Sequence, residues 1–245
     1  MRYHAEARRA AERYGSAQGL LWLDGEDMAN HEYLGHWDEA LEMSERVLAA
    51  AEESGFYLES PARTCRARIF LARGELAAAL VETERLVVLA AESTDHQIVG
   101  PALLWRARAL VEASHGEEVA PLLDRALAQM GLQTHMMAEL PLLLVTLGRG
   151  SDYLDATADA ALLTPWIEAG RKAATGDLRA AAAIYADIGT RPIESDARVL
   201  AAQALVAAGR HAEADAELRP ALAFYREVRA TAYLARAEAL LTATG

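Results

Sequence analysis

Three pairs of a carboxylate and a histidine lie four residues apart in the sequence, a spacing that places both side chains on one face of a helix. Such a pair can supply two ligands to a metal ion. The pairs are Asp27 with His31, Glu32 with His36, and Glu92 with His96. None of them has a third ligand of known proximity, so we interpret them as solvated or capping pairs and predict neither a metal site nor a cofactor.

Motifs for nucleophilic and phosphate chemistry are incomplete. Gly148-Arg149-Gly150 is not followed by the Gly-Lys-Ser/Thr that completes a phosphate-binding loop. Ser114 has Glu112 where a nucleophile elbow needs its first glycine. The single cysteine, Cys65, excludes an internal disulfide and a cysteine zinc cluster. We therefore predict a non-catalytic protein and keep a helical enzyme as an alternative.

A recurring sequence motif, in which an alanine comes five residues after a glycine, predicts the helices that position these side chains. The four copies are Gly35 to Ala40, Gly74 to Ala79, Gly176 to Ala181 and Gly209 to Ala214, with a looser copy from Gly116 to Ala120. The five alanines are 39, 41, 61 and 33 residues apart. Periods of this size, built from a turn and a pair of helices, indicate an α-solenoid.

We therefore predict an all-α fold: a right-handed α-solenoid of antiparallel helix pairs with a C-terminal capping helix. One domain is expected over residues 1–245, with an irregular segment at about 132–162. The expected helices cover residues 2–14, 17–33, 38–53, 61–73, 75–91, 97–113, 117–130, 135–147, 152–162, 165–175, 177–188, 193–208, 211–227 and 230–243.

Prolines mark several of the expected helix boundaries. Ser60-Pro61 and Thr164-Pro165 each predict a helix start, with the hydroxyl as the cap and proline in the first turn. Pro141 must lie in the first turn of its helix or kink it. Pro220 lies inside the helix expected at 211–227, so we predict a kink or a break there.

Composition and charge restrict the class of partner. The chain is 53% hydrophobic and 6% aromatic, with more than fifty alanines, which favours closely packed helices. Its net charge of −12 opposes contact with nucleic acid or with an anionic membrane surface. No long apolar segment or signal-peptide core is present, so we expect a cytoplasmic location.

Tryptophan and arginine side chains give the best candidates for a binding surface, because these residue types dominate recognition sites. Trp105 lies about 200° around its helix from Leu103, away from the expected core stripe. Aligned on the repeated alanines, six residues would face the concave groove of the solenoid: Trp22, Glu26, Arg68, Trp105, Arg106 and Trp166. In the alternative interpretation, each tryptophan packs between neighbouring repeats. Met130, Met136 and Met137 would similarly form either an adaptable apolar patch or part of the core.

The second helices of the expected pairs carry a small residue, a large one four later and a small one three after that. Ala181 with Tyr185, and Ala214 with Leu218 and Ala221, fit this order. On these residues the chain resembles tetratricopeptide-repeat proteins, although the usual Trp, Leu-Gly and Tyr of the first helix are largely absent. The resemblance covers most of the chain and implies a superhelix that binds other proteins.

A narrower resemblance lies at the C-terminal end, in residues 207–214 and 222–241. These runs are similar to the end of the repeat arm in LuxR-type ATP-binding transcriptional activators and in multidomain nucleotide cyclases of bacteria. In those proteins the arm follows an ATPase module and serves as a sensor or docking surface. The chain has neither the ATPase nor the DNA-binding part, so the resemblance implies a fragment or a truncated relative.

The expected function is therefore that of a scaffold that binds a protein or peptide segment, as the interaction or sensor arm of a bacterial regulator. Arginines of the groove would pair with carboxylates of the ligand, and tryptophans would cover its apolar groups. A sensor for a small molecule or signal peptide is the first alternative. A homodimer through the terminal repeats also stays open.

Overall fold

Alanine-rich segments separated by glycine form helices throughout the part of the chain that can be described. The computed structural model describes residues 2–54, 58–130 and 134–242. Within these three ranges there are fourteen α-helices, two short 3₁₀ helices and no strand. The predicted all-α class is confirmed. None of these helices combines the length and apolar character that crossing a bilayer requires.

The helices follow the expected ranges closely in the first half of the chain. Their bounds are α1 (Arg2–Tyr14), α2 (Ala17–Leu34), α3 (Trp37–Ser54), α4 (Glu59–Arg73), α5 (Leu76–Ala91), α6 (His96–Glu112), η1 (Gly116–Glu118) and α7 (Val119–Leu127). The second half contains η2 (Thr134–Met137), α8 (Leu140–Thr146), α9 (Gly150–Ala156), α10 (Pro165–Ala174), α11 (Leu178–Ile188), α12 (Arg191–Ala207), α13 (His211–Glu227) and α14 (Thr231–Thr242).

Glycine ends helix α2 in a left-handed conformation that other residues adopt at a cost. Gly35 has φ +88°, and its N–H donates to the carbonyl of Glu32 at 3.1 Å. A Cβ at this position would also lie 2.8 Å from Cε2 of Phe224. Gly35 is thus required both by the turn and by the close approach of α13.

The two predicted Ser/Thr-Pro caps differ in the structure. The Oγ1 of Thr164 accepts a hydrogen bond from the N–H of Ile167 at 3.3 Å, as a cap should. The prediction for Ser60 is wrong, because α4 begins one residue earlier, at Glu59, and Leu58 takes the cap position without a side-chain hydrogen bond. Ser60 is buried inside the first turn and so does not occupy the cap position.

The expected helices at 135–147 and 152–162 are wrong in extent. The helix expected at 135–147 is divided into η2 and α8, and Pro141 lies in the first turn of α8 as expected.

The helix expected at 152–162 ends at Ala156, so residues 157–164 form turns and irregular backbone. Of the kink or break expected at Pro220, the break is absent, since α13 runs from His211 to Glu227, and the kink stays a prediction. Residues 131–133 and 243–245, which the predicted segments include, lie outside the described residues.

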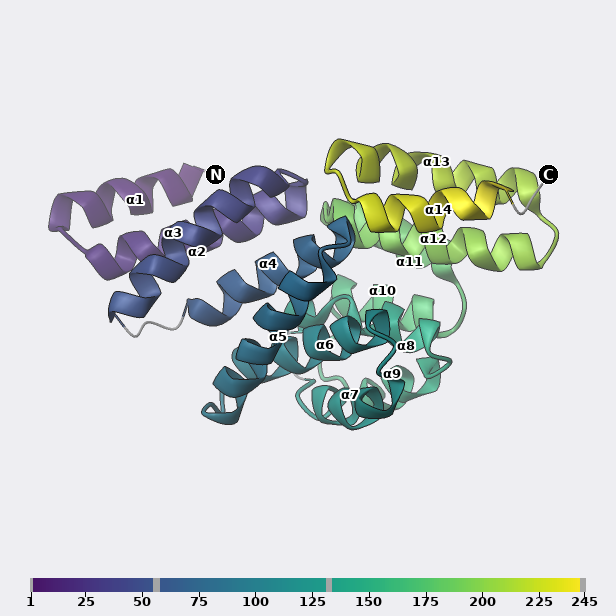
Figure 1. Ribbon diagram of the computed structural model, residues 1–245, viewed down its shortest axis with the longest axis horizontal. Coiled ribbons are helices and arrows are strands. Elements are labelled where there is room, and N and C mark those ends of the chain that lie inside the picture. The colour runs from purple at the N-terminus through teal and green to yellow at the C-terminus, as the bar shows by residue number, and fades with distance from the viewer. Residues whose placement is uncertain (1, 55–57, 131–133, 243–245) are drawn as a thin grey trace.

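Most successive helices pack side by side, and the C-terminal helices lie against α2–α4, although the two termini are on opposite sides of the molecule in Figure 1. Helix α14 packs against α4, and α12 packs against α2. One buried apolar cluster therefore joins both ends of the chain, with Met28 in α2, Trp37 in α3, Ile69 in α4, Leu218 in α13 and Ala237 in α14. Two further clusters hold α4–α9 and α8–α12 together.

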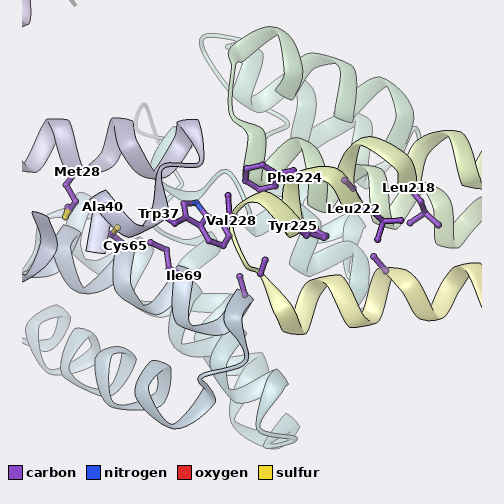
Figure 2. Packing of buried hydrophobic residues seen from close by; sticks show 14 of the residues in the cluster. Met28, Trp37, Ala40, Cys65, Ile69, Leu218, Leu222, Phe224, Tyr225 and Val228 are labelled. Atoms are coloured by element: carbon purple, nitrogen blue, oxygen red, sulfur yellow. The ribbon is translucent and has the colours of Figure 1, made fainter. Parts of the chain in front are cut away.

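The contact between the two ends is both apolar and polar. Figure 2 shows Trp37 facing Phe224 and Val228 across the junction, and the rings of Trp37 and Phe224 meet edge to face with centroids 5.7 Å apart. The hydroxyl of Thr231 donates to the carbonyl of Arg73 at 2.7 Å, and Asp38 pairs with both Arg73 and Arg229.

Side chains fill the centre enclosed by these helices. A cavity of about 10 Å³ remains there, lined by residues that include Trp37, Arg68, Trp105, Glu139 and Tyr225. That volume is enough for about one water molecule. A neighbouring hollow of about 120 Å³ shares Asp196, Tyr225 and Tyr233 with this cavity, and the concave groove expected of a solenoid stays a prediction.

Candidate functional site

A cavity of about 230 Å³ lies between α2, α4, the start of α6 and η2. We call it the α2–α4 pocket. Much of its wall is apolar, and this part comprises Trp22, Met28, Ala29, Leu58, Pro61, Pro101 and Met136. Its polar lining consists of Glu26, Asn30, Glu32, Tyr33, Thr64, Cys65, Arg68, Gln97 and His135.

Helical periodicity explains which residues line the pocket. On α2, Trp22, Glu26, Ala29 and Tyr33 recur at intervals of three and four and so share one face. On α4, Pro61, Cys65 and Arg68 do the same. The pocket is therefore the space between two facing helix surfaces, closed at one end by η2.

Gly25 lies where α2 meets the start of α4. A Cβ on Gly25 would lie 3.0 Å from Cδ2 of Leu58, so the end of the Leu58 side chain would have to move by a few tenths of an ångström to make room for it.

Arg68 pairs with two carboxylates beneath the pocket. Its Nη1 donates to Oε2 of Glu32, and its Nη2 lies 2.7 Å from Oε1 of Glu139. The three side chains come from α2, α4 and the residue that precedes α8, and each residue is more than nine-tenths buried. We call Glu32, Arg68 and Glu139 the buried triad. With both carboxylates ionised, the triad carries one net negative charge.

The extra negative charge acts on the protonation of Glu139. Burial raises the pKa of Glu139 to about 7, the nearby guanidinium of Arg68 opposes this rise, and the carboxylate of Glu32 adds to it. Neither oxygen of Glu139 has a hydrogen-bond partner of good geometry, and Oε1 of Glu32 has none. The buried triad thus leaves carboxylate oxygens of both glutamates, and also the Nε donor of Arg68, without a hydrogen-bond partner.

Aromatic rings surround the guanidinium of Arg68. Its Cζ lies 4.8 Å from the ring centroid of Trp105 and 5.6 Å from that of Tyr33. Tyr33 lies 6.4 Å from Trp166, which in turn lies 6.4 Å from His135. These contacts hold the cation in place by its interaction with the ring faces and connect the pocket to α10.

Five of the six residues predicted to face a groove lie in or next to this region. Trp22, Glu26 and Arg68 line the α2–α4 pocket, and Trp22 is 43% exposed. Trp105 is only 3% exposed and lies against Arg68 in the centre of the molecule, so it packs between helices. Trp166 is half-buried and contacts two residues of the pocket wall.

Arg106 lies apart from the other five. Its Nη1 donates to the carbonyl of Leu80 at 3.3 Å and to Oγ1 of Thr83 at 3.5 Å, so the side chain connects α6 to α5. Of the three methionines, Met136 lines the α2–α4 pocket, Met137 is buried against Gly100, and Met130 lines a separate hollow beside α9.

The sequence interpretation missed Glu32 and Glu139 as partners of Arg68. One signal was present for Glu32, which lies four residues after the buried Met28 and so on the core side of α2. Glu139 stands directly before the apolar run Leu140 to Leu144, a place where a charged residue is buried only if it is paired. Neither signal identifies the partner.

Burial raises the pKa of the Cys65 thiol well above its usual value, which keeps it in the unreactive protonated form. In the ranges that the structure covers, no group of three or more His, Cys, Asp or Glu side chains is arranged to hold a metal ion.

Sequence comparison adds no relative to this description. No protein-family model matches the chain, and no curated protein is significantly similar to it.

Proposed function

We propose that the protein is a non-catalytic binding module whose ligand occupies the α2–α4 pocket with an apolar body and a positively charged, hydrogen-bond-donating group. The observation that carries the proposal is Glu32, a carboxylate that is 3% exposed, lines this apolar pocket and keeps Oε1 without a hydrogen-bond partner. A buried carboxylate oxygen in that state favours a ligand that brings a donor to it.

The charge balance of the pocket supports a cation. Arg68 faces two carboxylates in the buried triad, and Glu26 adds a third carboxylate at the exposed end of the pocket. Oγ1 of Thr64, on the facing helix, is also buried without a partner and can accept a hydrogen bond. Trp22 and Tyr33 also line the pocket, and the faces of aromatic rings attract an organic cation.

This polarity is the reverse of the one expected from the sequence, in which arginines would pair with acidic groups of the ligand. Arg68 is already neutralised by Glu32 and Glu139, and Arg106 is engaged with α5. A carboxylate entering the pocket would meet Glu32 and Glu26 at close range. The apolar part of the expected recognition, through Trp22 and the methionines, is retained in the proposal.

Two matching ionic groups support a repeat arrangement. Glu59 pairs with Arg63 four residues on, and Arg63 pairs with Glu82 nineteen residues further. Glu194, Arg198 and Glu217 form the same group at the same spacings, between α12 and α13. Each group joins a first helix to the second helix of its pair. We take these as equivalent positions of one repeated unit.

On this basis, we include in the proposal a degenerate tetratricopeptide-like array with right-handed curvature, serving as the interaction or sensor arm of a bacterial regulator. The sequence resemblance to such arms and the paired helices support this assignment. The ligand is either a small organic amine or a peptide that inserts a lysine or arginine side chain, since both combine an apolar body with a positively charged hydrogen-bond donor.

The experiment is calorimetric titration of the full chain with three probes that share one phenyl body. Phenethylammonium, 2-phenylethanol and phenylacetate differ in charge, so we expect binding to fall in that order and to be undetectable for phenylacetate. A Glu32→Gln variant removes the preference for the cation, while Glu84→Gln, an exposed glutamate on α5, retains it. Equal or tighter binding of phenylacetate contradicts the proposal.

A second variant covers the case in which Glu32→Gln does not fold. Ala29→Phe fills the pocket from α2 while all three residues of the buried triad are retained, and we expect it to abolish binding of phenethylammonium. Unchanged binding places the ligand elsewhere and contradicts the proposal. A further titration, with an N-terminally acetylated peptide that contains a free lysine side chain, distinguishes the two kinds of ligand. Tighter binding of the peptide than of phenethylammonium identifies a peptide ligand, and weaker binding identifies a small amine.

A further inference from the structure

The C-terminal turn of α2 brings two histidines together. His31 is in the last turn of the helix, and His36 follows the left-handed Gly35. Their Nδ1 atoms are 3.3 Å apart. Both side chains line a cavity of about 600 Å³ that Tyr33 also lines, and His36 is exposed while His31 is half-buried.

Backbone geometry fixes this proximity. The N–H of His36 donates to the carbonyl of His31 at 2.8 Å, and the N–H of Gly35 donates to that of Glu32 at 3.1 Å. These two bonds form a Schellman motif, in which the side chains at the first and sixth positions meet. Apolar residues usually occupy both positions, whereas here both are imidazoles.

A second turn of the same kind confirms that side chains five residues apart meet in this geometry. The N–H of Asp177 donates to the carbonyl of Lys172 at 2.9 Å across the left-handed Gly176. The Nζ of Lys172 then lies 3.4 Å from Oδ2 of Asp177. The sequence interpretation considered only pairs four residues apart, and it therefore did not pair His31 with His36.

We propose that His31 and His36 chelate a divalent transition-metal ion through their Nδ1 atoms. Two imidazole nitrogens bound at the usual length to a tetrahedral ion are roughly 3.3 Å apart, which matches the observed separation. Imidazole ligands suit zinc, nickel, copper and cobalt rather than calcium or magnesium. The protein supplies two ligands, and water or a group from a partner completes the coordination.

The site differs from the α2–α4 pocket, because neither histidine lines that pocket, although Asn30 and Tyr33 line both cavities. The neutral alternative is a single Nδ1–H···Nδ1 hydrogen bond between the two rings, with no ion. The two arrangements differ in one measurable respect, since only the first makes stability depend on the concentration of zinc or nickel.

The test is calorimetric titration of the untagged full chain with Zn²⁺ and with Ni²⁺ at neutral pH. We expect one ion per chain and a melting temperature that rises with metal concentration. His31→Gln and His36→Gln each weaken binding by about tenfold or more, as the loss of even an indirect ligand contact can do. The matched control, His115→Gln with His211→Gln, removes two exposed histidines and leaves affinity unchanged.

Far-UV circular dichroism of each variant shows that the helices are retained. No detectable binding of either ion to the wild-type chain overturns the proposal, and so does binding that survives either the His31 or the His36 substitution. Loss of binding in the control double variant also overturns it, because the ion would then be held elsewhere.

Discussion

The guanidinium of Arg68 lies face-on to the indole of Trp105, with Cζ 4.8 Å from the ring centroid. This contact links α4 to α6 in the centre of the molecule, directly beneath the α2–α4 pocket. Because the same guanidinium pairs with Glu32 and Glu139, one cation connects α2, α4, α6 and the segment before α8. The stability of the fold and the polarity of the pocket therefore depend on the same residue.

Replacement of Arg68 tests this connection. Arg68→Met retains apolar bulk but leaves two buried carboxylates without their cation, so we expect a loss of about 3–5 kcal/mol in the free energy of unfolding at pH 7. Urea denaturation measures it, with Arg46→Met on the exposed side of α3 as the control. A loss below about 1 kcal/mol in the Arg68 variant would show that the triad is not a structural centre.

Stability should depend on pH through Glu139. Its pKa in the folded protein is about 7, against 4.5 for an ordinary glutamate, so the folded state binds a proton more tightly than the unfolded state. The contribution of Glu139 to stability is full below pH 4.5 and is lost as pH rises towards 7. Relative to wild type, Glu139→Gln should therefore gain stability over this interval, by on the order of 3 kcal/mol in total.

Chemical denaturation of the wild type and of Glu139→Gln at several pH values from 4.5 to 8 measures this difference. Other titrating groups, such as Asp38 and Glu227, whose pKa values are lowered by arginine partners, cancel because both proteins contain them. The Glu84→Gln variant should show a difference that does not change with pH. A flat or falling difference for Glu139→Gln contradicts the assignment.

Packing of α10 on α9 should forbid a side chain at Gly170. A Cβ there would lie 2.5 Å from Cζ of Tyr153, which is 2% exposed and has no space to move into. We expect Gly170→Ala to lose about 1–3 kcal/mol through overpacking, although alanine is the better helix former. Gly116→Ala, where nothing lies within 4 Å of the new Cβ, should be neutral or stabilising. Thermal denaturation compares the two variants.

Two threonines at helix starts should respond oppositely to replacement by valine. Thr164→Val loses the hydrogen bond from Ile167 and should cost about 1 kcal/mol. Thr190 is 1% exposed and its Oγ1 has no partner, so Thr190→Val removes an unsatisfied polar atom and should be neutral or stabilising. Urea denaturation of both variants measures the contrast, and equal losses would contradict it.

Local signals in the sequence predicted most helices, because glycine turns and alanine-rich faces act within a few residues. Thr164 capped its helix as expected, since a hydroxyl followed by proline needs no distant partner. Ser60 did not, because burial of the first turn of α4 is decided by helices far away in the sequence. The irregular segment was mispredicted for the same reason.

The site could be predicted only in part. Trp22 and Glu26 were found because aromatic and charged residues on one helix face are visible in the sequence. The apolar stripe of α6 could not show whether Trp105 is buried. Helix α6 packs against α4, α5, α7 and η2, so nearly all of its faces are buried. Glu139 was missed because its pairing with Arg68 joins residues that only the tertiary fold brings together.

The most direct measurement of the proposed binding site is methyl NMR of the chain labelled at methionine, titrated with phenethylammonium. Met28 and Met136 line the α2–α4 pocket, whereas Met43 lies on α3 and Met130 beside α9. We predict that the resonances of Met28 and Met136 shift and saturate while those of Met43 and Met130 stay in place. No shift at Met28 and Met136, or a larger shift at Met130, would contradict the account.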